Sequence, residues 1–568
     1  MISKFNFFFP EINVKKIIFV ALISVGYGLS TIVTIYLVSN LFGVFNSSSA
    51  IDTPLIINFI INVIETKFNL SEDLSYLFIS ISFLILMTVL GLVKLFLVSK
   101  ICSISRHKLS LRILNKILKI QNFPEDEKHQ GDLKSLVLDE AQQIVKQLLK
   151  PIIEILTSSI FIIFLLIYLF FFNFSITLFI FIIFGLVYLV NFLLISASVK
   201  HHGNLRFVNN NKRYSRIDDA FNLKLVSTIL KTLDTFIDRY SKFSQKMAYH
   251  QYKFDFISNA PKFFIEGFIF LSIFSLIFYS YSESSLVNEN SGFIKILIVY
   301  ALTGLKILPE LQKIFLSFGL LKFGSSSQSG TIDIMMSKNL PILKPIEKSV
   351  FDKKSKKLIL NFNCDACFRG KTKVLNEIKF KLFDGDKIAI KGKSGAGKTT
   401  LINAIMGLSP VKIKEVSYLF NANVNFGYVP QETHLFSGTI LENITLGRLC
   451  DKSKLNLINY YTSKLFPEFS TIKTEKFLER FIEDTTGGLS VGQKQRLGLL
   501  RAIFDSPEIL ILDEFTSALD EKSEEIIIEF VKNLRTYKCL IIIGHREKST
   551  EICKSIYNLE EGNLFKFK

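Results

Sequence analysis

The sequence lacks tryptophan altogether, has few cysteines and prolines (six and 12 of 568 residues), and is short of acidic charge. Asp and Glu number 50 against 68 Lys and Arg, which gives a formal net charge of +18. Only 21% of the residues are charged, whereas 49% are hydrophobic and the mean hydropathy is +0.36. This composition excludes a disordered chain and a coiled coil. The length excludes a single small module, so we expect two or more structural units.

The few cysteines do not form the pattern of a disulfide-linked or zinc-binding domain. Cys364 and Cys367 have C-x-x-C spacing, but no second pair completes a four-ligand site, so we interpret the pair as a chance occurrence in a strand. The other four are Cys102, Cys450, Cys539 and Cys553. All six fall in segments that we expect in the cytoplasm, where thiols stay reduced. The sequence therefore predicts free thiols.

The basic excess does not indicate nucleic-acid binding, because Lys and Arg cluster beside long apolar runs. In that position they face anionic lipid and orient the chain by the positive-inside rule. The apolar runs fill roughly the first 320 residues, and ordinary soluble patterning follows. This division predicts a multi-pass membrane protein with a cytosolic domain after the membrane part.

Six apolar runs are long enough to cross a hydrocarbon layer of about 30 Å. They are residues 17–42, 76–98, 155–172, 176–199, 263–281 and 293–320. The first run is too long for a cleavable signal peptide, so we expect it to be an anchor. The long loops at 106–150 and 200–253 are rich in Lys and Arg and are expected in the cytoplasm. Residues 54–64 are expected to form a helix on the outer membrane face, with a disordered loop as the alternative.

A glycine-rich loop at residues 392–400 lies between a predicted buried strand at 387–391 and a predicted helix. This strand–loop–helix context is that of a P-loop, in which backbone N–H groups close on phosphates. Lys398 would reach the β and γ phosphates of a nucleotide, and Thr399 would coordinate Mg²⁺. The loop therefore predicts a nucleoside triphosphate bound with Mg²⁺.

Two further predicted strands, at 509–512 and 540–543, end in polar residues. The first is followed by Asp513 and Glu514, and the second by Gly544 and His545. Because the carboxyl ends of parallel strands share one edge of a sheet, these residues are expected beside the P-loop. Asp513 would hold Mg²⁺ and Glu514 would polarise a water. An exposed acidic turn is the alternative for either carboxylate alone.

Several motifs around the P-loop resemble those of ATP-binding cassette (ABC) proteins. Residues 489–496, Leu-Ser-Val-Gly-Gln-Lys-Gln-Arg, look like the signature sequence, with Val491 in place of the usual glycine. Residues 428–431, 517–520 and 544–546 resemble the Q-loop, D-loop and H-loop, and Phe368 stands where family members stack an aromatic ring on adenine.

This resemblance covers nearly the whole chain and implies half of an exporter. The implied fold is an all-α six-helix transmembrane domain at residues 1–325, a linker at 326–357 and an α/β P-loop NTPase domain, the cassette, at 358–568. Short helices near the cytoplasmic loops would dock on the cassettes.

The resemblance also implies ATP and Mg²⁺ as cofactors and assigns roles to single residues. Glu514, His545 and Gln431 would act in catalysis, and Thr399, Gln431 and Asp513 would hold the metal. The nucleotide would be bound by Phe368, Gly392, Ser394, Gly395, Gly397, Lys398, Thr399, Thr400, Ser490, Gly492, Gln493 and Asp520. Ser490 and Gly492 would face the P-loop of a second copy or of a similar half-transporter. Val491 would lower turnover at most, so we expect an active ATPase.

The cargo is predicted from charges near the membrane spans. Lys94, Lys262 and Lys306 lie in or at the edge of spans, where an unpaired charge costs about 2.5–3.5 kcal/mol. They predict an anionic ligand, and the alternative is that they snorkel or pair, Lys262 with Glu266 and Lys306 with Glu310.

Together with the outer segment at 54–64, the motif at residues 260–267 is similar to that of lipid-linked oligosaccharide flippases. That resemblance implies an ATP-driven exporter of an amphipathic, anionic lipid-linked glycan in a bacterial inner membrane. The implied partners are the lipid bilayer and the glycolipid, with no nucleic acid. An exporter of peptides or hydrophobic small molecules, or a regulatory half-transporter subunit, is the alternative.

Overall fold

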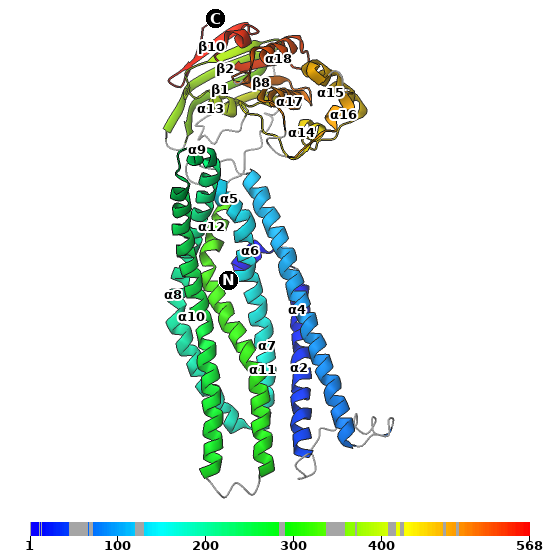
Figure 1. The fold of residues 1–568 in the computed structure, drawn as a ribbon, viewed down its shortest axis with the longest axis vertical. Coiled ribbons are helices and arrows are strands. Elements are labelled where there is room, and N and C mark those ends of the chain that lie inside the picture. Colours follow the sequence, from blue (N-terminus) through cyan, green and yellow to red (C-terminus); the bar gives the residue numbers. More distant parts are fainter. Residues whose placement is uncertain are drawn as a thin grey trace. The chain divides into compact units, whose positions relative to one another are not determined.

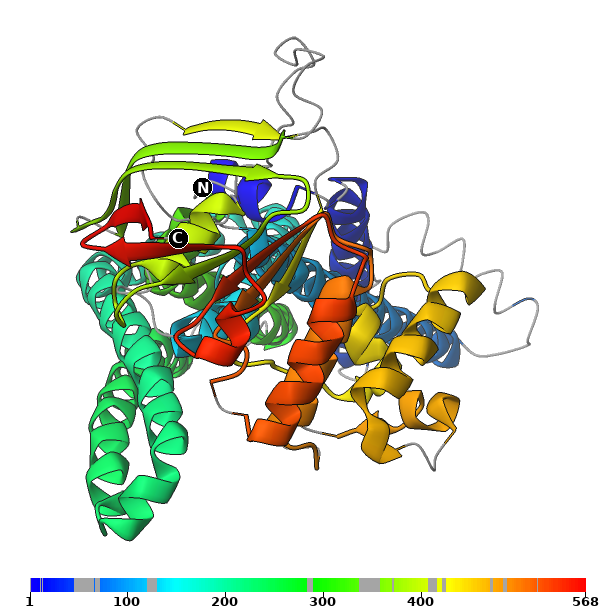
Figure 2. The ribbon, with the colours of Figure 1, turned by 90° about the horizontal axis from the view of Figure 1, so that it is seen from above.

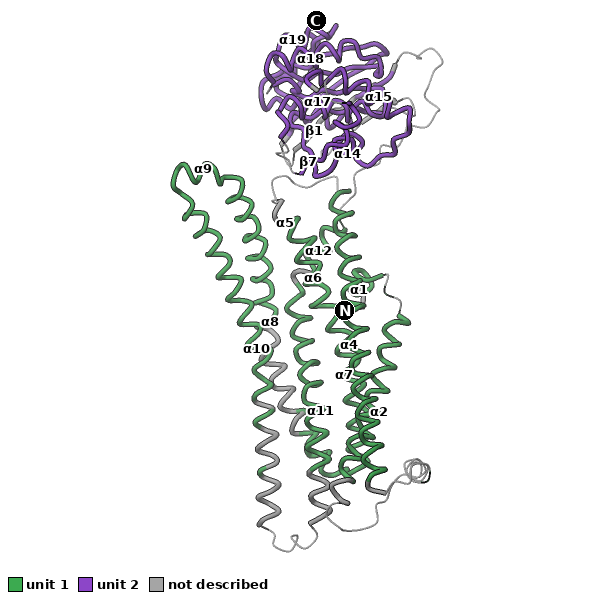
Figure 3. The backbone as a smooth tube through the Cα atoms, turned by 45° about the vertical axis from the view of Figure 1, so that its right-hand side comes forward, with its two compact units in different colours: residues 1–120, 125–337 green, residues 121–124, 338–568 purple. Residues whose placement is uncertain are grey.

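The computed structural model of the protein describes residues 2–10, 12, 14–44, 66, 72–119, 130–282, 290–336, 358–369, 372–406, 416–420, 425–469, 473–483, 488–517 and 519–567. The chain divides into two compact units, coloured separately in Figure 3. Unit 1 comprises Met1–Ile120 and Glu125–Ser337, and unit 2 comprises Gln121–Pro124 and Lys338–Lys568. The domain boundaries expected at residues 325 and 357 stay predictions.

Unit 1 is helical throughout the part that the structure describes. Its longer helices are α2 (Val14–Val44), α4 (Glu72–Lys119), α7 (Lys150–Phe172), α8 (Phe174–Asn222), α10 (Leu233–Ser282) and α11 (Asn290–Phe323). Its shorter ones are α1 (Ile2–Phe8), α5 (Gln130–Ser135), α6 (Ala141–Ile144), α9 (Lys224–Ile229) and α12 (Ser325–Met336). Two π-helical turns, η1 (Leu136–Glu140) and η2 (Val145–Leu149), flank α6.

Three helices of unit 1 are far longer than a membrane span needs. Helices α4, α8 and α10 contain 48, 49 and 50 residues, which correspond to about 72–75 Å at 1.5 Å per residue. This is more than twice the thickness of the hydrocarbon layer, so each helix must continue outside it. Figure 1 shows α8 and α10 running side by side up to α9.

Within the described residues, three helical segments have the length and composition of membrane spans. They are Val14–Asn40, Leu74–Lys119 and Leu133–Phe172, and they contain most or all of the first three predicted spans. The fourth to sixth predicted spans lie on α8, α10 and α11. The count of six spans stays a prediction, and the outer helix expected at 54–64 lies outside the described residues.

A tight turn at Asn173 joins α7 to α8. This residue ends α7 in an extended conformation and caps α8, because its side-chain oxygen accepts a hydrogen bond from the backbone N–H of Ile176 at 3.1 Å. A buried ion pair also joins distant parts of unit 1. Arg206 of α8 lies 3.4 Å from Glu140 of η1, and both side chains are at most 3% exposed.

Unit 2 contains a six-stranded sheet with the strand order β11-β10-β3-β9-β8-β5. These strands are β3 (Lys387–Lys391), β5 (Phe426–Val429), β8 (Ile509–Asp513), β9 (Cys539–Ile543), β10 (Ser555–Glu560) and β11 (Asn563–Lys566). All neighbouring pairs are parallel except β10 with β11. Every residue of β8 and β9 is buried, as the continuous apolar runs of their sequences predict.

A second, antiparallel sheet of order β2-β1-β4 forms a separate layer of unit 2, visible in Figure 2. It consists of β1 (Leu358–Arg369), β2 (Thr372–Phe383) and β4 (Val416–Phe420). A two-stranded sheet pairs β6 (Gly438–Thr439) with β7 (Phe481–Ile482). The helices of the unit are α13 (Lys398–Ile405), α14 (Ile440–Thr445), α15 (Lys452–Leu465), α16 (Thr474–Leu478), α17 (Val491–Ile503), α18 (Glu521–Asn533) and α19 (Glu547–Thr550), with a 3₁₀ turn, η6, at Pro467–Phe469.

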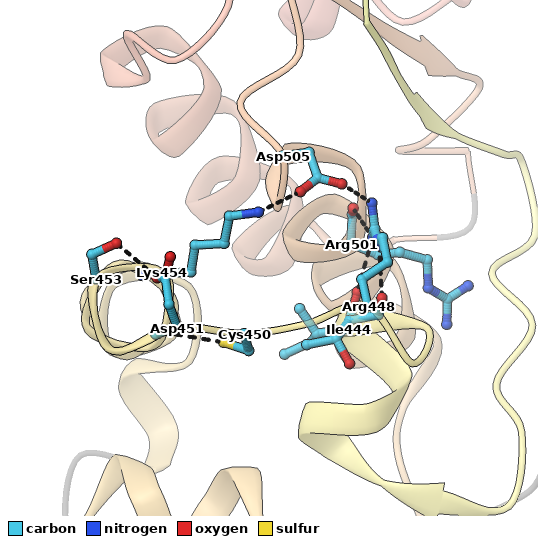
Figure 4. A network of polar contacts seen from close by, with 9 residues as sticks. Ile444, Arg448, Cys450, Asp451, Ser453, Lys454, Arg501 and Asp505 are labelled. Atoms are coloured by element: carbon cyan, nitrogen blue, oxygen red, sulfur yellow. Dashed lines mark hydrogen bonds and ion pairs between the residues drawn. The ribbon is translucent and has the colours of Figure 1, made fainter.

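The helical part of unit 2 is tied together by a charged network, drawn in Figure 4. Asp505 accepts hydrogen bonds from Arg448 and from Lys454, the latter at 2.8 Å, and both cations also lie over the ring of Phe504. The lysine, more than the arginine, holds the pKa of Asp505 below its usual value by hydrogen bonding. This network joins α15 to the loop that follows α17 and fixes the connection after α14.

Candidate nucleotide-binding site

The candidate site lies at one edge of the six-stranded sheet. Strands β5, β8, β9 and β3 are consecutive neighbours and parallel, so their carboxyl ends meet at that edge. The predicted Q-loop, acidic pair, H-loop and P-loop follow these four strands in that order. Segments that are more than 100 residues apart in the sequence are thereby brought to one place, as the sequence predicts.

The P-loop adopts a backbone that its glycines permit. Gly395 and Gly397 have φ of 82° and 98°, in the region where only glycine is unstrained. A Cβ on Gly397 would also lie 3.0 Å from Val374, and one on Gly392 would lie 2.5 Å from the carbonyl oxygen of Leu559. Helix α13 then begins at Lys398, so its free N–H groups and dipole point into the loop.

Lys398 contacts three other residues of the site. Its side chain is 7% exposed, and its Nζ donates a hydrogen bond to the carbonyl oxygen of Gly392 at 2.6 Å. The same Nζ lies 2.8 Å from Nε2 of His545 and 3.3 Å from Oε1 of Glu514. Three of the predicted site residues therefore converge on one buried ammonium group.

Two of the residues predicted to act in catalysis, Gln431 and Glu514, are also in contact. Gln431 Nε2 donates a hydrogen bond to Glu514 Oε2 at 3.0 Å. Glu514 has φ of 41°, a conformation that costs free energy for a non-glycine residue, and its N–H donates to the carbonyl of Ile543 at 2.9 Å. The strained backbone turns the carboxylate away from the buried strand and toward Lys398.

Asp513 ends β8 and is 5% exposed. Burial raises the pKa of its carboxyl group and the charge of Glu514 adds to this, while a hydrogen bond from the hydroxyl of Tyr428, at 3.1 Å, opposes it. The pKa of Tyr428 is raised mainly by burial and further by the carboxylate of Asp513. A carboxylate that burial disfavours is one that a bound cation would stabilise.

The residues predicted to hold Mg²⁺ have the donor chemistry that this ion requires. Asp513, Thr399 and Gln431 offer a carboxylate, a hydroxyl and an amide oxygen, all of them hard oxygen donors. In the part of the chain that the structure describes, no group of three or more His, Cys, Asp or Glu could hold a metal ion without such hydroxyl or amide donors. The oxygen donors therefore fit Mg²⁺.

The signature segment begins helix α17. Ser490 caps it through a capping box with Gln493, whose backbone N–H donates to Ser490 Oγ at 3.2 Å. Gly492 packs against α18, where an added Cβ would lie 2.8 Å from Oγ of Ser523. Val491, by contrast, is 52% exposed. The departure from the usual glycine thus places its side chain on the surface, where it leaves the cap intact.

A second network behind the signature was not anticipated from the sequence. Gln495 Nε2 donates to the carbonyl oxygen of Gln431, and its Oε1 accepts from Thr433 at 3.0 Å. Arg496 is buried and bonds to Glu468 at 2.7 Å and to Ser523 at 3.2 Å. The contacts of Gln495 connect α17 to the Q-loop, and those of Arg496 connect it to η6 and α18. In the sequence, the polar run after Ser490 indicates nucleotide binding and does not reveal these structural contacts.

Comparisons with known proteins agree with this geometry. The family model for the ABC transporter transmembrane region matches residues 17–303, and that for the ABC transporter matches residues 375–517. The chain belongs to the ABC transporter family. The predicted resemblance and the fold class, a helical membrane domain followed by a cassette, are both confirmed.

Several relatives of this ABC transporter share part of its length. A probable ABC transporter ATP-binding/permease protein of Haemophilus influenzae is 30% identical over 240 residues, 39% of this chain and 42% of that protein. An ATP-dependent lipid A-core flippase of Coxiella burnetii is 37% identical over 204 residues, 34% of each. The chain thus spans about two fifths or less of these relatives.

A solved structure of a bacterial Atm1-family ABC exporter with ATP bound shares the fold. It aligns with 97% of this chain and 94% of its own, at a TM-score of 0.76 and 16% identity.

The remaining predicted nucleotide residues of the ABC transporter lie on the P-loop, α13, α18 and β1. Ser394 and Thr399 are exposed on the P-loop and Thr400 is half-buried in the first turn of α13. Asp520 caps α18 by accepting a hydrogen bond from the N–H of Ser523 at 3.2 Å. Phe368 lies in β1, and its side chain is outside the described part of the structure.

The three predicted substrate lysines have different surroundings. Lys262 pairs with Glu266 at 3.8 Å, as the alternative interpretation expected. Lys94 is half-buried near enough to Glu310 for their charges to interact. Glu310 itself bonds to Lys313 at 2.6 Å and to Ser158, so the suggested pairing of Lys306 with Glu310 is wrong within the described residues.

Proposed function

We propose that this ABC transporter hydrolyses ATP to export, or flip across the membrane, an amphipathic and anionic lipid-linked glycan. The ATPase part of the proposal rests on the contacts of Lys398. Its Nζ lies within 3.3 Å of both Glu514 and His545. A water beside Glu514 would lie next to the phosphate group that Lys398 holds. The fusion of such a site to apolar helices couples hydrolysis to movement across a bilayer.

In this mechanism each side chain has a defined task. Lys398 and the P-loop N–H groups bind the phosphates, and Glu514, oriented by Gln431, accepts the proton of the attacking water. His545 contacts the lysine and would bind the γ-phosphate. Asp513, Thr399 and Gln431 would hold Mg²⁺, which neutralises phosphate charge when bound.

A second cassette completes the proposed site. Ser490 is exposed at the positive end of α17, so its hydroxyl and the first N–H groups of the helix can reach a nucleotide on a facing subunit. We assign that role to a second copy of this chain or to a similar half-transporter. The assembly would lie in the inner membrane of a bacterium with its cassettes in the cytoplasm.

The cargo proposal rests on Lys306 and on the flippase relatives. Two of the three lysines have acidic neighbours, whereas Lys306 has no ion-pair partner among the residues that the structure describes. A half-buried ammonium without a carboxylate partner suits an anionic head group. Two relatives, from Coxiella burnetii and Idiomarina loihiensis, are named as lipid A-core flippases.

The test is a flipping assay in proteoliposomes that contain a fluorescent polyprenyl-pyrophosphate glycan. The expected result is that ATP moves the dye into the leaflet that a membrane-impermeant quencher cannot reach. This protection from quenching should be absent in Glu514→Gln, and its rate should be reduced at least about tenfold in Lys306→Ala. Lys322→Ala on the same helix is the control for loss of one charge. Robust ATP hydrolysis without flipping would retain the ATPase and overturn the glycan cargo. Absence of hydrolysis in the wild type would overturn both.

A further inference from the structure

A cavity of about 490 Å³ lies in unit 1, and none of the residues assigned to nucleotide or cargo lines it. Its walls come from the end of α1 and the residues that follow it, from the first two turns of α2, and from residues 97–112 of α4. The volume falls within the range of about 300–1,000 Å³ that ligand pockets occupy. Its deepest side chains are apolar, because Phe8, Phe9, Val20 and Leu109 line it and are at most 5% exposed.

The short helix α1 is fixed over this cavity by a cation. Arg112 of α4 donates hydrogen bonds to the backbone carbonyl oxygens of Phe8 and Phe7, at 3.0 and 3.4 Å. These carbonyls belong to the last turn of α1, where the carbonyl oxygens have no N–H donors within the helix. The helix dipole also favours a positive charge at this end. These hydrogen bonds hold α1 against α4, so α1 forms a fixed side of the cavity.

The rim of the cavity is strongly basic. Lys15, Lys16, Lys100 and Lys108 all line it and are exposed, and Arg112 adds a fifth cation. None of the described residues that line the cavity is acidic. An apolar floor below a ring of positive charge is complementary to a molecule with an anionic head and an apolar tail.

The position of the cavity along the helices indicates where such a molecule comes from. Lys15 and Lys16 directly precede the first predicted span, and Lys100 follows the end of the second. Both predicted spans therefore leave the hydrocarbon layer at the level of this rim, on the side that the positive-inside rule assigns to the cytoplasm. Phe19, which lies in the first predicted span, lines the cavity and is 54% exposed, so the apolar part opens toward lipid at this residue.

We propose that this cavity binds an anionic phospholipid of the cytoplasmic leaflet, with its phosphate among the lysines and an acyl chain along Phe19. The site is separate from Lys94, Lys262 and Lys306, none of which lines it. Binding needs no ATP turnover, so the proposal stands or falls independently of the proposed transport function.

The test exploits the absence of tryptophan from the chain. A Phe19→Trp variant places a single fluorophore in the cavity, and a Phe263→Trp variant places one at the cytoplasmic end of the fifth predicted span, where the side chain is 69% exposed. Each variant is reconstituted without ATP in bilayers that contain either brominated phosphatidylglycerol or brominated phosphatidylcholine, with the other lipid unlabelled. Bromine quenches tryptophan at short range, so the quenching reports which lipid occupies the neighbourhood.

The expected result is a preference for phosphatidylglycerol on the order of tenfold at Trp in place of Phe19 and little preference at the Phe263 position. Adding Lys16→Gln and Lys100→Gln should remove most of that preference. Lys242→Gln with Lys246→Gln, two exposed lysines of α10, should leave it unchanged. Equal quenching by both lipids at the Phe19 position would overturn the proposal. So would an equal preference at both positions, since it would belong to the leaflet as a whole. Loss of the preference in millimolar inorganic phosphate would reveal a simple anion site instead of a lipid site.

Discussion

Replacing Glu140 with glutamine isolates the contribution of the buried ion pair in unit 1. Glu140 is 0% exposed, lies in η1 and faces Arg206 of α8 at 3.4 Å, with Asn210 also donating to it at 3.3 Å. Gln at this position keeps the shape and one oxygen to accept from Asn210, and it replaces the oxygen that faces Arg206 with an NH₂ group, so the charge and the acceptor for Arg206 are both lost. The guanidinium of Arg206, 3% exposed, then has lost its opposing carboxylate inside the protein.

The burial of the pair sets the expected magnitude. Breaking a buried ion pair by removing one partner costs about 3–5 kcal/mol, whereas exposed pairs contribute about 0–1 kcal/mol. At roughly 2 °C per kcal/mol for a large domain, Glu140→Gln should lower the unfolding temperature by at least about 6 °C. Asp219→Asn breaks the neighbouring pair with Arg216, whose side chains are both 38% exposed, and should shift it by about 1 °C or less.

The assay heats purified protein in nanodiscs and measures the fraction that stays monodisperse on gel filtration. A double variant, Glu140→Gln with Arg206→Met, removes both charges and should recover most of the lost stability, because the cost arises from the uncompensated cation. Equal unfolding temperatures of Glu140→Gln and Asp219→Asn would refute the argument that burial of the pair sets the cost. A double variant no more stable than Glu140→Gln would refute the argument that the cost arises from the uncompensated cation.

Three further predictions concern the cassette. Glu514→Gln should reduce the rate of ATP hydrolysis by about 10²–10⁴-fold while binding of a fluorescent nucleotide persists. The control Glu508→Gln, at the other end of β8, should hydrolyse ATP normally. Equal loss in both variants would contradict the assignment of Glu514. Gly492→Ala should cost about 1–3 kcal/mol of stability because its Cβ meets a buried serine, and Val491→Ala should be near neutral in the same melting assay. The pKa of Asp513 is raised by burial, so its ionisation destabilises the fold as pH rises above the unfolded pKa of about 3.9. Asp513→Asn should therefore raise the unfolding temperature at pH 7, with a gain that shrinks toward pH 4, and should weaken stabilisation by Mg-ATP; an unchanged melt at both pH values would refute this.

The cassette was the part most open to prediction, because its function depends on short runs of residues at the ends of buried strands. The strands predicted at 387–391, 509–512 and 540–543 are followed by Gly392, Asp513 and Gly544, and each lies within a parallel strand, β3, β8 or β9. Once these strands are parallel neighbours, the positions of Lys398, Glu514 and His545 follow from topology alone.

What the sequence did not reveal depends on partners that are distant in the chain. Arg496 and Glu468 are 28 residues apart, and Arg206 and Glu140 are 66 apart, so neither pair has a local pattern. The π-helical turns η1 and η2 likewise have no sequence signature, since they differ from an α-helix by one residue in the hydrogen-bond register. The segment predicted to start the linker includes α12, where Gln328 and Thr331 are buried.

The lysines of the membrane half show why cargo is harder to predict than catalysis. In sequence, Lys94, Lys262 and Lys306 are equivalent charges in apolar surroundings, and helical spacing suggests only the partners three or four residues away. That rule found Glu266 for Lys262, but it assigned Glu310 to Lys306, whereas the structure places Glu310 of α11 with Lys313, with Ser158 of α7 and near Lys94 of α4. A carboxylate shared among three helices neutralises charge that would otherwise attract an anion. Binding of an anionic head group must therefore be sought at Lys306 first, and a cargo that is bound without it would have to be recognised by its apolar part.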